Sequence, residues 1–167
     1  MPYFFETKQL TLRTMQAEDL EDITLIWGDT QVMQYSGGPS TTEKISRSIE
    51  SYQRLYEEKG YSVYTVLLKE NSRIIGVCGF NPSDNENEAE LIYHLHPNYW
   101  GKGYATEAAS ACVKDLKDRK SDIKKIKASV DPNNPSSSKV LSKIGMTAKG
   151  MKWFDDTQQE ELYYELE

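Results

Sequence analysis

One junction limits the folds open to this chain more than any other feature: a strand-like segment that leads into two glycines and then into a helix. Residues 90–95 have strand character, Gly101-Lys102-Gly103 follows after a turn, and residues 104–117 have helical periodicity. Glycine lets a backbone approach an anion closely, and the free N–H groups of a first helical turn attract negative charge. The junction therefore suits a diphosphate, although a helix start that uses glycine only to turn explains the spacing equally well.

Two other phosphate-binding motifs do not fit the sequence. A dinucleotide-binding fold requires a third glycine where Thr106 stands, and it also requires an early βαβ unit, which is absent here. The P-loop pattern G-x-x-x-x-G-K-[ST] does not occur. Both nucleotide interpretations are therefore excluded.

Hydrophobic periodicity predicts the remaining helices and strands, and their order indicates one mixed α/β domain over residues 1–167. Within residues 90–95, alternation places Glu90, Ile92 and His94 on one face and the intervening residues on the other. The expected helices span residues 17–27, 41–59, 104–117 and 135–144, and the expected strands span residues 11–15, 61–68, 74–80, 90–95, 123–130, 147–154 and 161–166.

Composition excludes several classes of protein. The net charge of −6 disfavours nucleic acid as a partner and weakly favours a cationic substrate. No apolar run is long enough to cross a bilayer, and the first residues lack the features of a signal peptide, so we expect a cytoplasmic protein without a membrane partner. The two cysteines and two histidines lack the spacing of a disulfide framework or a zinc site, so no metal is expected.

The segment His96-Pro97-Asn98-Tyr99-Trp100-Gly101-Lys102-Gly103-Tyr104-Ala105-Thr106-Glu107-Ala108 resembles the cofactor-binding motif of the GNAT superfamily of acetyl-CoA N-acyltransferases. The likeness is greatest to the Rim-type branch, which includes enzymes that acetylate the N-termini of ribosomal proteins. Further blocks match that branch in order and with similar gaps, so the resemblance spans nearly the whole chain. These blocks are Arg13, Gly76, Glu90-Leu91-Ile92-Tyr93, Asn134-Pro135-Ser136-Ser137 and Lys143-Ile144-Gly145-Met146.

The resemblance implies a mostly antiparallel sheet, flanked by four helices, in which two central parallel strands, residues 90–95 and 123–130, splay apart. Acetyl-CoA, as a cosubstrate, would lie in the gap. An unpaired strand edge is a natural partner for the amides of pantetheine. The implied cofactor-binding residues are His94, Leu95 and His96 for pantetheine, the N–H groups of Trp100, Gly101, Lys102, Gly103, Tyr104 and Ala105 for the diphosphate, together with Thr106, Asn134 and Ser137.

The resemblance also implies direct attack of a neutral amine on the acetyl carbonyl, which needs a proton acceptor and a proton donor. Glu90 matches an acidic position of the branch and is the candidate base, unless it is only an exposed strand-end carboxylate. His94 is the alternative base, directly or through water, unless it is structural. The family's usual donor tyrosine is replaced by Leu141, so Ser137 or water would protonate the thiolate. Asn134 and Ser137 are also well suited to cap a helix.

The acceptor would be a small-molecule amine or a protein N-terminal amine, held between the loop at residues 34–39 and the helix at residues 41–59. Four tyrosines, Tyr35, Tyr52, Tyr56 and Tyr61, either line this cleft or belong to the core. A homodimer could form by pairing of residues 161–166. The alternative to an active enzyme is a catalytically silent, regulatory acyl-CoA-binding module.

Overall fold

The computed structural model describes residues 2–167, and eight strands in that part of the chain form a single sheet. The spatial order is β1-β2-β3-β4-β5-β6-β8-β7, and every neighbouring pair is antiparallel except β5 and β6. The predicted mixed, mostly antiparallel sheet is therefore confirmed. The strands are β1 (Phe4–Glu6), β2 (Leu10–Thr14), β3 (Val63–Leu68), β4 (Ile74–Pro82), β5 (Glu88–Leu95), β6 (Lys125–Val130), β7 (Thr147–Phe154) and β8 (Gln159–Leu166).

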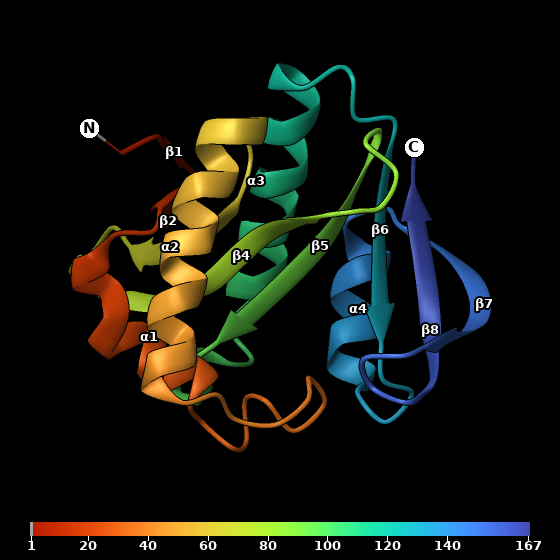
Figure 1. Cartoon of the computed structure of the whole chain (residues 1–167), viewed down its shortest axis with the longest axis horizontal. Helices are drawn as coiled ribbons and strands as arrows, with labels where there is room; N and C mark the ends of the chain where they lie inside the picture. The colour runs from red at the N-terminus through yellow and green to blue at the C-terminus, as the bar shows by residue number, and fades with distance from the viewer. Residues whose placement is uncertain (1) are drawn as a thin grey trace.

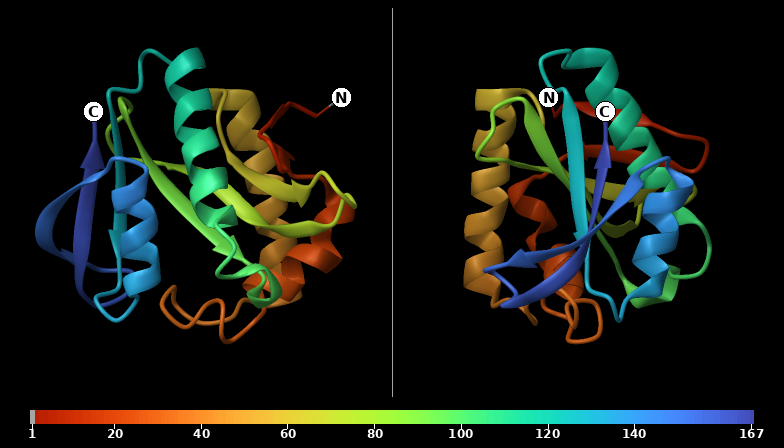
Figure 2. Two further views of the ribbon diagram at one scale, coloured as in Figure 1. Left: turned by 180° about the vertical axis from the view of Figure 1, so that it is seen from behind. Right: turned by 90° about the vertical axis from the view of Figure 1, so that its right-hand side faces the viewer.

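Two helices cover each face of the sheet, which gives three layers (Figures 1 and 2). The first face carries α1 (Leu20–Trp27) and α2 (Thr42–Lys59), whose apolar residues pack with Val63 and Val77 of the sheet. The opposite face carries α3 (Tyr104–Arg119) and α4 (Pro135–Lys143), which share a larger core with the central strands. The four predicted helices are thus present, and their apolar stripes follow the spacing that the sequence indicates.

Local signals explain where the helices begin and end. Thr41 caps α2, since its hydroxyl accepts a hydrogen bond from the Lys44 N–H at 3.3 Å, and Gly60 ends the helix in the left-handed conformation. The turn at residues 17–19 is a 3₁₀ turn, Ala17–Asp19, rather than the first turn of α1. There the Asp19 carboxylate accepts two hydrogen bonds from Arg13 and one from the buried Thr65, which fixes the turn against β2 and β3.

The central strands separate after a short stretch of pairing. The register joins β5 to β6 at only three positions, the last of which is Glu90 opposite Lys127. Beyond that point β5 continues to Leu95 and β6 continues to Val130 without pairing to each other, and the two ribbons diverge in Figure 1. The expected splay is therefore present, and Glu90 lies where it opens.

Several details differ from the sequence expectations. The strand β1 was not predicted, because three residues at the sheet edge carry too little alternation to be recognised. The segment expected to pair across a dimer belongs to β8, which lies between β6 and β7, so both of its edges are already paired. Within residues 2–167, no helix combines the length and apolar character that crossing a bilayer requires.

Candidate active site

The edge of β5 that faces the gap carries backbone groups without a strand partner. The His96 N–H donates to the Ile75 carbonyl of β4 at 2.8 Å, so by alternation the backbone groups of His94 and His96 point to β4. Those of Tyr93 and Leu95 point the other way, into the gap. Only Leu95 of the three predicted contact residues therefore offers its backbone there, and its carbonyl accepts a hydrogen bond from the Trp100 indole at 2.8 Å.

The glycine-containing loop supplies a row of unpaired N–H groups next to this edge. Gly101 and Gly103 have φ values of 74° and 84°, a region that L side chains rarely adopt. Within residues 2–167, the N–H groups of residues 101–103 donate no hydrogen bond to the backbone, and those of residues 104–106 lie in the first turn of α3, where no intrahelical acceptor exists. The Trp100 N–H is different, because it donates to the Pro97 carbonyl at 3.1 Å.

Glu90 stands in a largely buried setting at the opening of the splay. Burial raises the pKa of its carboxyl above the ordinary value, and the nearby Asp156 adds to this effect, while Lys127 and a hydrogen bond to Asn81 oppose it. The Tyr52 hydroxyl of α2 donates to the Asn81 Oδ1 at 2.7 Å. The carboxyl group is therefore not a freely exposed strand-end carboxylate but part of a chain of polar side chains that leads to α2.

Both ring nitrogens of His94 are engaged. The Trp27 indole N–H donates to the His94 Nδ1 at 3.1 Å, so the neutral ring carries its proton on Nε2, which lies 3.1 Å from the Ser36 Oγ. Burial lowers the pKa of His94 to about 4. The side chain therefore joins α1, β5 and the loop that precedes α2, and it has no free acceptor nitrogen in this arrangement.

Ser137 and Asn134 lie on the far side of the gap, at the start of α4. The Asn134 Oδ1 accepts a hydrogen bond from the Ser137 N–H at 3.4 Å, so the helix-capping role considered for Asn134 is present. The Ser137 hydroxyl lies 2.7 Å from the hydroxyl of Tyr93, which reaches across from β5. Leu141 is buried in the core and offers no proton to the gap.

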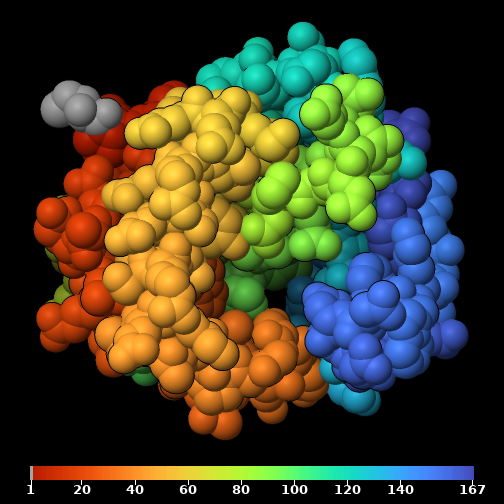
Figure 3. Space-filling model, in the orientation of Figure 1, coloured from red at the N-terminus to blue at the C-terminus, as the bar shows by residue number. Residues whose placement is uncertain are grey.

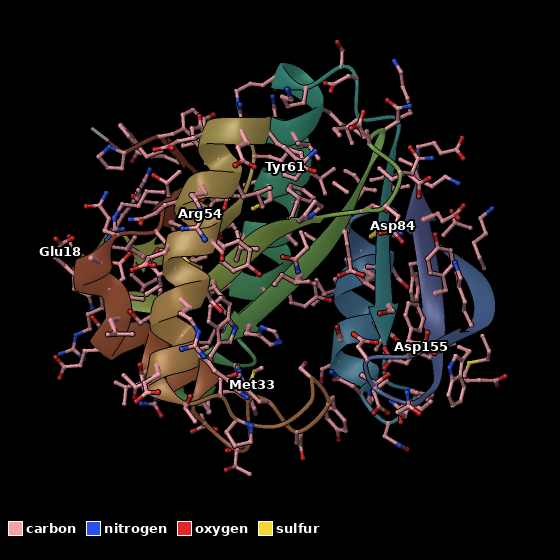
Figure 4. The ribbon with its side chains drawn as sticks, viewed as in Figure 1. Glu18, Met33, Arg54, Tyr61, Asp84 and Asp155 are labelled. Atoms are coloured by element: carbon pink, nitrogen blue, oxygen red, sulfur yellow. The ribbon has the colours of Figure 1, made fainter. Side chains whose placement is uncertain are left out.

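The four tyrosines considered for the cleft have different surroundings. Tyr52 lines a groove beside α2, and Tyr35 belongs to the loop that Ser36 joins to β5. Tyr56 stacks on the Tyr3 ring with centroids 5.3 Å apart, and Tyr61, labelled in Figure 4, is buried in the core. Tyr61 is therefore a core residue, and Tyr56 is partly buried and packs against the same core.

The structure adds residues that sequence reasoning did not select. Trp27, Asn81 and Tyr93 make the polar contacts to His94, Glu90 and Ser137, but each comes from a separate element and no local pattern marks it. Together the site combines a partly buried carboxyl group, a hydroxyl pair, an unpaired strand edge and a row of free N–H groups. Such a site can bind an extended amide-bearing chain that ends in a diphosphate and can move protons at the opposite end.

Comparisons with known proteins identify relatives of this chain and solved structures with the same fold. Residues 9–147 match the family model described as the acetyltransferase (GNAT) domain. An uncharacterized N-acetyltransferase of Bacillus licheniformis is 33% identical over 149 residues, which cover 87% of this chain and 83% of that protein. The GNAT-family acetyltransferase of Bacillus anthracis has the same fold, with a TM-score of 0.84 and 25% identity over 98% of each chain. A ribosomal-protein alpha-N-acetyltransferase solved with coenzyme A has a TM-score of 0.83 at 17% identity, over 98% of this chain and 97% of its own.

Proposed function

The chain belongs to the GNAT acetyltransferase family, and from that premise we propose that it transfers the acetyl group of acetyl-CoA to a primary amine by direct attack within a ternary complex. One observation carries the proposal: the unpaired edge of β5 leads from Glu90 to a loop of free N–H groups. In this proposal pantetheine would bind along the edge, the diphosphate would bind the loop, and the partly buried carboxyl group of Glu90 would lie at the reacting end.

The residues present fit acetyl-CoA. Its thioester supplies an activated acetyl carbonyl and a thiolate leaving group. The backbone of Leu95 and Tyr93 faces the gap and would bind the pantetheine amides, and the N–H groups of residues 101–106 would bind the diphosphate. The Asn134 amide nitrogen is a further candidate contact, since its oxygen already caps α4.

Glu90 is the base in this proposal. A carboxylate whose pKa is raised by burial is better matched to accepting a proton near neutral pH than an exposed carboxylate. His94 is less suited, because its Nδ1 already accepts the Trp27 N–H and its low pKa makes it a weak acceptor. We therefore assign Glu90 the proton of the incoming amine, directly or through water.

The proton for the departing thiolate would come from the Ser137 hydroxyl. Tyr93 positions this hydroxyl, since the Tyr93 O–H donates to the Ser137 carbonyl at 3.0 Å and its oxygen lies 2.7 Å from the Ser137 Oγ. Burial raises the pKa of Tyr93, which keeps its hydroxyl protonated at the pH of catalysis. The pair would take the place of the tyrosine that Leu141 replaces.

A panel of primary amines with acetyl-CoA tests the proposal, with release of free thiol and the mass of the product as readouts. We expect transfer to at least one amine above the rate of acetyl-CoA hydrolysis, and a strong loss of rate in Ser137→Ala. Tight acetyl-CoA binding without transfer to any amine would instead support the catalytically silent, regulatory module, which the buried Leu141 favours.

A further inference from the structure

A groove of about 630 Å³ runs along α2 and ends beside the candidate active site. The surface is hollowed between α2, in yellow, and the loop between β4 and β5, in lime (Figure 3). Its volume falls within the range of small-ligand sites. The lining residues are Ser40, Lys44, Arg47, Ser48, Ser51, Tyr52, Arg54, Leu55, Glu58, Asn81 and Pro82.

Three cationic side chains dominate the charge of this groove: Lys44, Arg47 and Arg54, the α2 cationic strip. Their spacing of three and seven residues places them along one side of the helix, and Figure 4 shows Arg54 projecting from α2. One acidic residue, Glu58, also lines the groove. The lining of the groove therefore carries a net positive charge, although the net charge of the whole chain is −6.

The three cations of the strip form no ion pair in the described part of the chain, although Glu43 and Glu50 stand four residues before Arg47 and Arg54. The Arg54 side chain makes one hydrogen bond, to the Ser51 hydroxyl at 3.3 Å. Clustered cations that are not paired with acidic groups raise the local electrostatic potential and attract anionic ligands.

The groove extends from the strip to Asn81, the residue of β4 that is paired with Glu90. Tyr52 also belongs to its lining. Arg47 precedes Tyr52 by five residues and Lys44 precedes it by eight, which corresponds to roughly 8 and 12 Å along the helix axis. A ligand with one end at Glu90 thus meets positive charge several ångströms away.

We propose that the acceptor is a primary amine that also carries an anionic group, a carboxylate or a phosphate, separated from the amine by several bonds. The anionic group would bind the α2 cationic strip and the amine would lie at Glu90. This inference rests on the proposed acetyl transfer, whose acceptor it specifies. It reverses the weak preference for a cationic acceptor that the net charge indicates, because the strip lines the groove on the α2 side of Glu90, whereas Asp156 and Glu161, the acidic side chains near Glu90, belong to the β7–β8 end of the sheet.

Three amines with the same six-carbon chain test the charge preference: aminohexanoate, hexylamine and diaminohexane. We expect kcat/KM for aminohexanoate to exceed that for diaminohexane by at least about tenfold, with hexylamine between them, and the difference to shrink as salt is added. Aminohexyl phosphate distinguishes a phosphate from a carboxylate preference. Equal values for all these amines, or a preference for diaminohexane, would overturn the inference while leaving acetyl transfer intact.

Charge-reversing variants locate the preference. Arg47→Glu and Arg54→Glu should each lower kcat/KM for aminohexanoate about tenfold or more, leave hexylamine nearly unchanged and leave acetyl-CoA binding unaltered. Arg73→Glu is the matched control, since Arg73 is also exposed but precedes β4 at the end remote from the groove, roughly 26 Å along the strand. If Arg73→Glu has the same effect as Arg47→Glu, net charge rather than the strip explains the preference and the inference fails.

A binding measurement keeps the test independent of turnover. Calorimetric titration of the wild-type protein and Arg47→Glu with aminohexanoate, in the presence of CoA, should show weaker binding to the variant. Identical binding isotherms would refute the inference even if no amine is acetylated. Failure of acetyl-CoA to bind, by contrast, would refute the proposed function, so the two failures are distinguishable.

Discussion

At the scale of single residues, the two candidate bases are separated by what their side chains already contact. His94 is held by Trp27 and Ser36 in one tautomer, and its pKa of about 4 keeps the ring neutral at physiological pH. Glu90 has instead a carboxyl group whose pKa is raised by burial. The raised pKa brings the Glu90 carboxylate closer to the pH of catalysis, and a general base requires such a pKa.

Glu90→Gln should lower the rate of acetyl transfer by a factor of about 10² to 10⁴, the range typical for removal of a general base. Acetyl-CoA affinity should remain nearly unchanged. Because the carboxylate is the active form, wild-type activity should fall as pH decreases through the raised pKa of Glu90, and this acid limb should disappear in the variant. A rate and pH profile equal to those of the wild type would remove Glu90 from the mechanism.

Asp19 illustrates a residue with a purely structural role. Burial alone would raise the pKa of Asp19, but hydrogen bonds from Arg13, the Gln16 N–H and Thr65 outweigh burial and lower it. Asp19→Asn should therefore destabilise the fold by about 3 kcal/mol, because it leaves the Arg13 guanidinium without its counter-charge. Urea unfolding measures this, with the exposed Asp22→Asn as the control, for which we expect little change.

The ion pair between Arg13 and Asp19 also determines how the free energy of unfolding changes with pH. A carboxyl group whose pKa is lowered on folding stabilises the native state above its unfolded pKa of about 3.9, and this contribution is lost as pH falls through the lower folded pKa. Below about pH 4 the free energy of unfolding of the wild type should thus decrease more steeply than that of Asp19→Asn. Parallel curves would show that the pKa of Asp19 is the same in the folded and the unfolded protein.

At the scale of elements, the close contact between β4 and β5 shapes the edge on which the cofactor proposal depends. A Cβ added at Gly76 would lie 2.3 Å from the Leu95 Cδ2 and 2.5 Å from the His94 carbonyl oxygen. Gly76→Ala should push β5 toward the gap, cost about 1–3 kcal/mol of stability and weaken acetyl-CoA binding. In Gly150→Ala the added Cβ meets nothing within 4 Å but must adopt a φ of 98°, so this control should lose stability through backbone strain and yet keep its acetyl-CoA affinity.

The elements also show where sequence reasoning succeeds. Helices with a full apolar stripe and strands with strong β-branched or aromatic content were predicted with small errors at their ends, as with α2 and β3. The strand β1 was missed because it gains its order from pairing with β2 rather than from its own pattern. Likewise, the sequence cannot show that β8 lies inside the sheet, because strand order is a long-range property that periodicity does not report.

At the scale of the whole molecule, the positions of the charged residues indicate the class of acceptor better than the net charge does. The sequence contains both the net charge of −6 and the helical spacing of Lys44, Arg47 and Arg54. Only the fold reveals that these cations form no ion pair among residues 2–167 and that they share a groove with Tyr52 and Asn81. The phosphate-type loop could be predicted because its residues are contiguous, whereas the contacts around Glu90 and Ser137 join elements that are distant in the chain.

The central claim is that acetyl-CoA binds in the gap between β5 and β6, and calorimetric titration with acetyl-CoA tests it most directly. Gly101→Glu serves as the site variant, with ATP and acetate as controls for nonspecific anion binding. We predict selective binding to the wild-type protein and a loss of about a hundredfold in the variant, since glutamate adds negative charge and a side chain at a φ of 74°. Absence of acetyl-CoA binding to the wild type, or equal affinity of both proteins, would contradict this account.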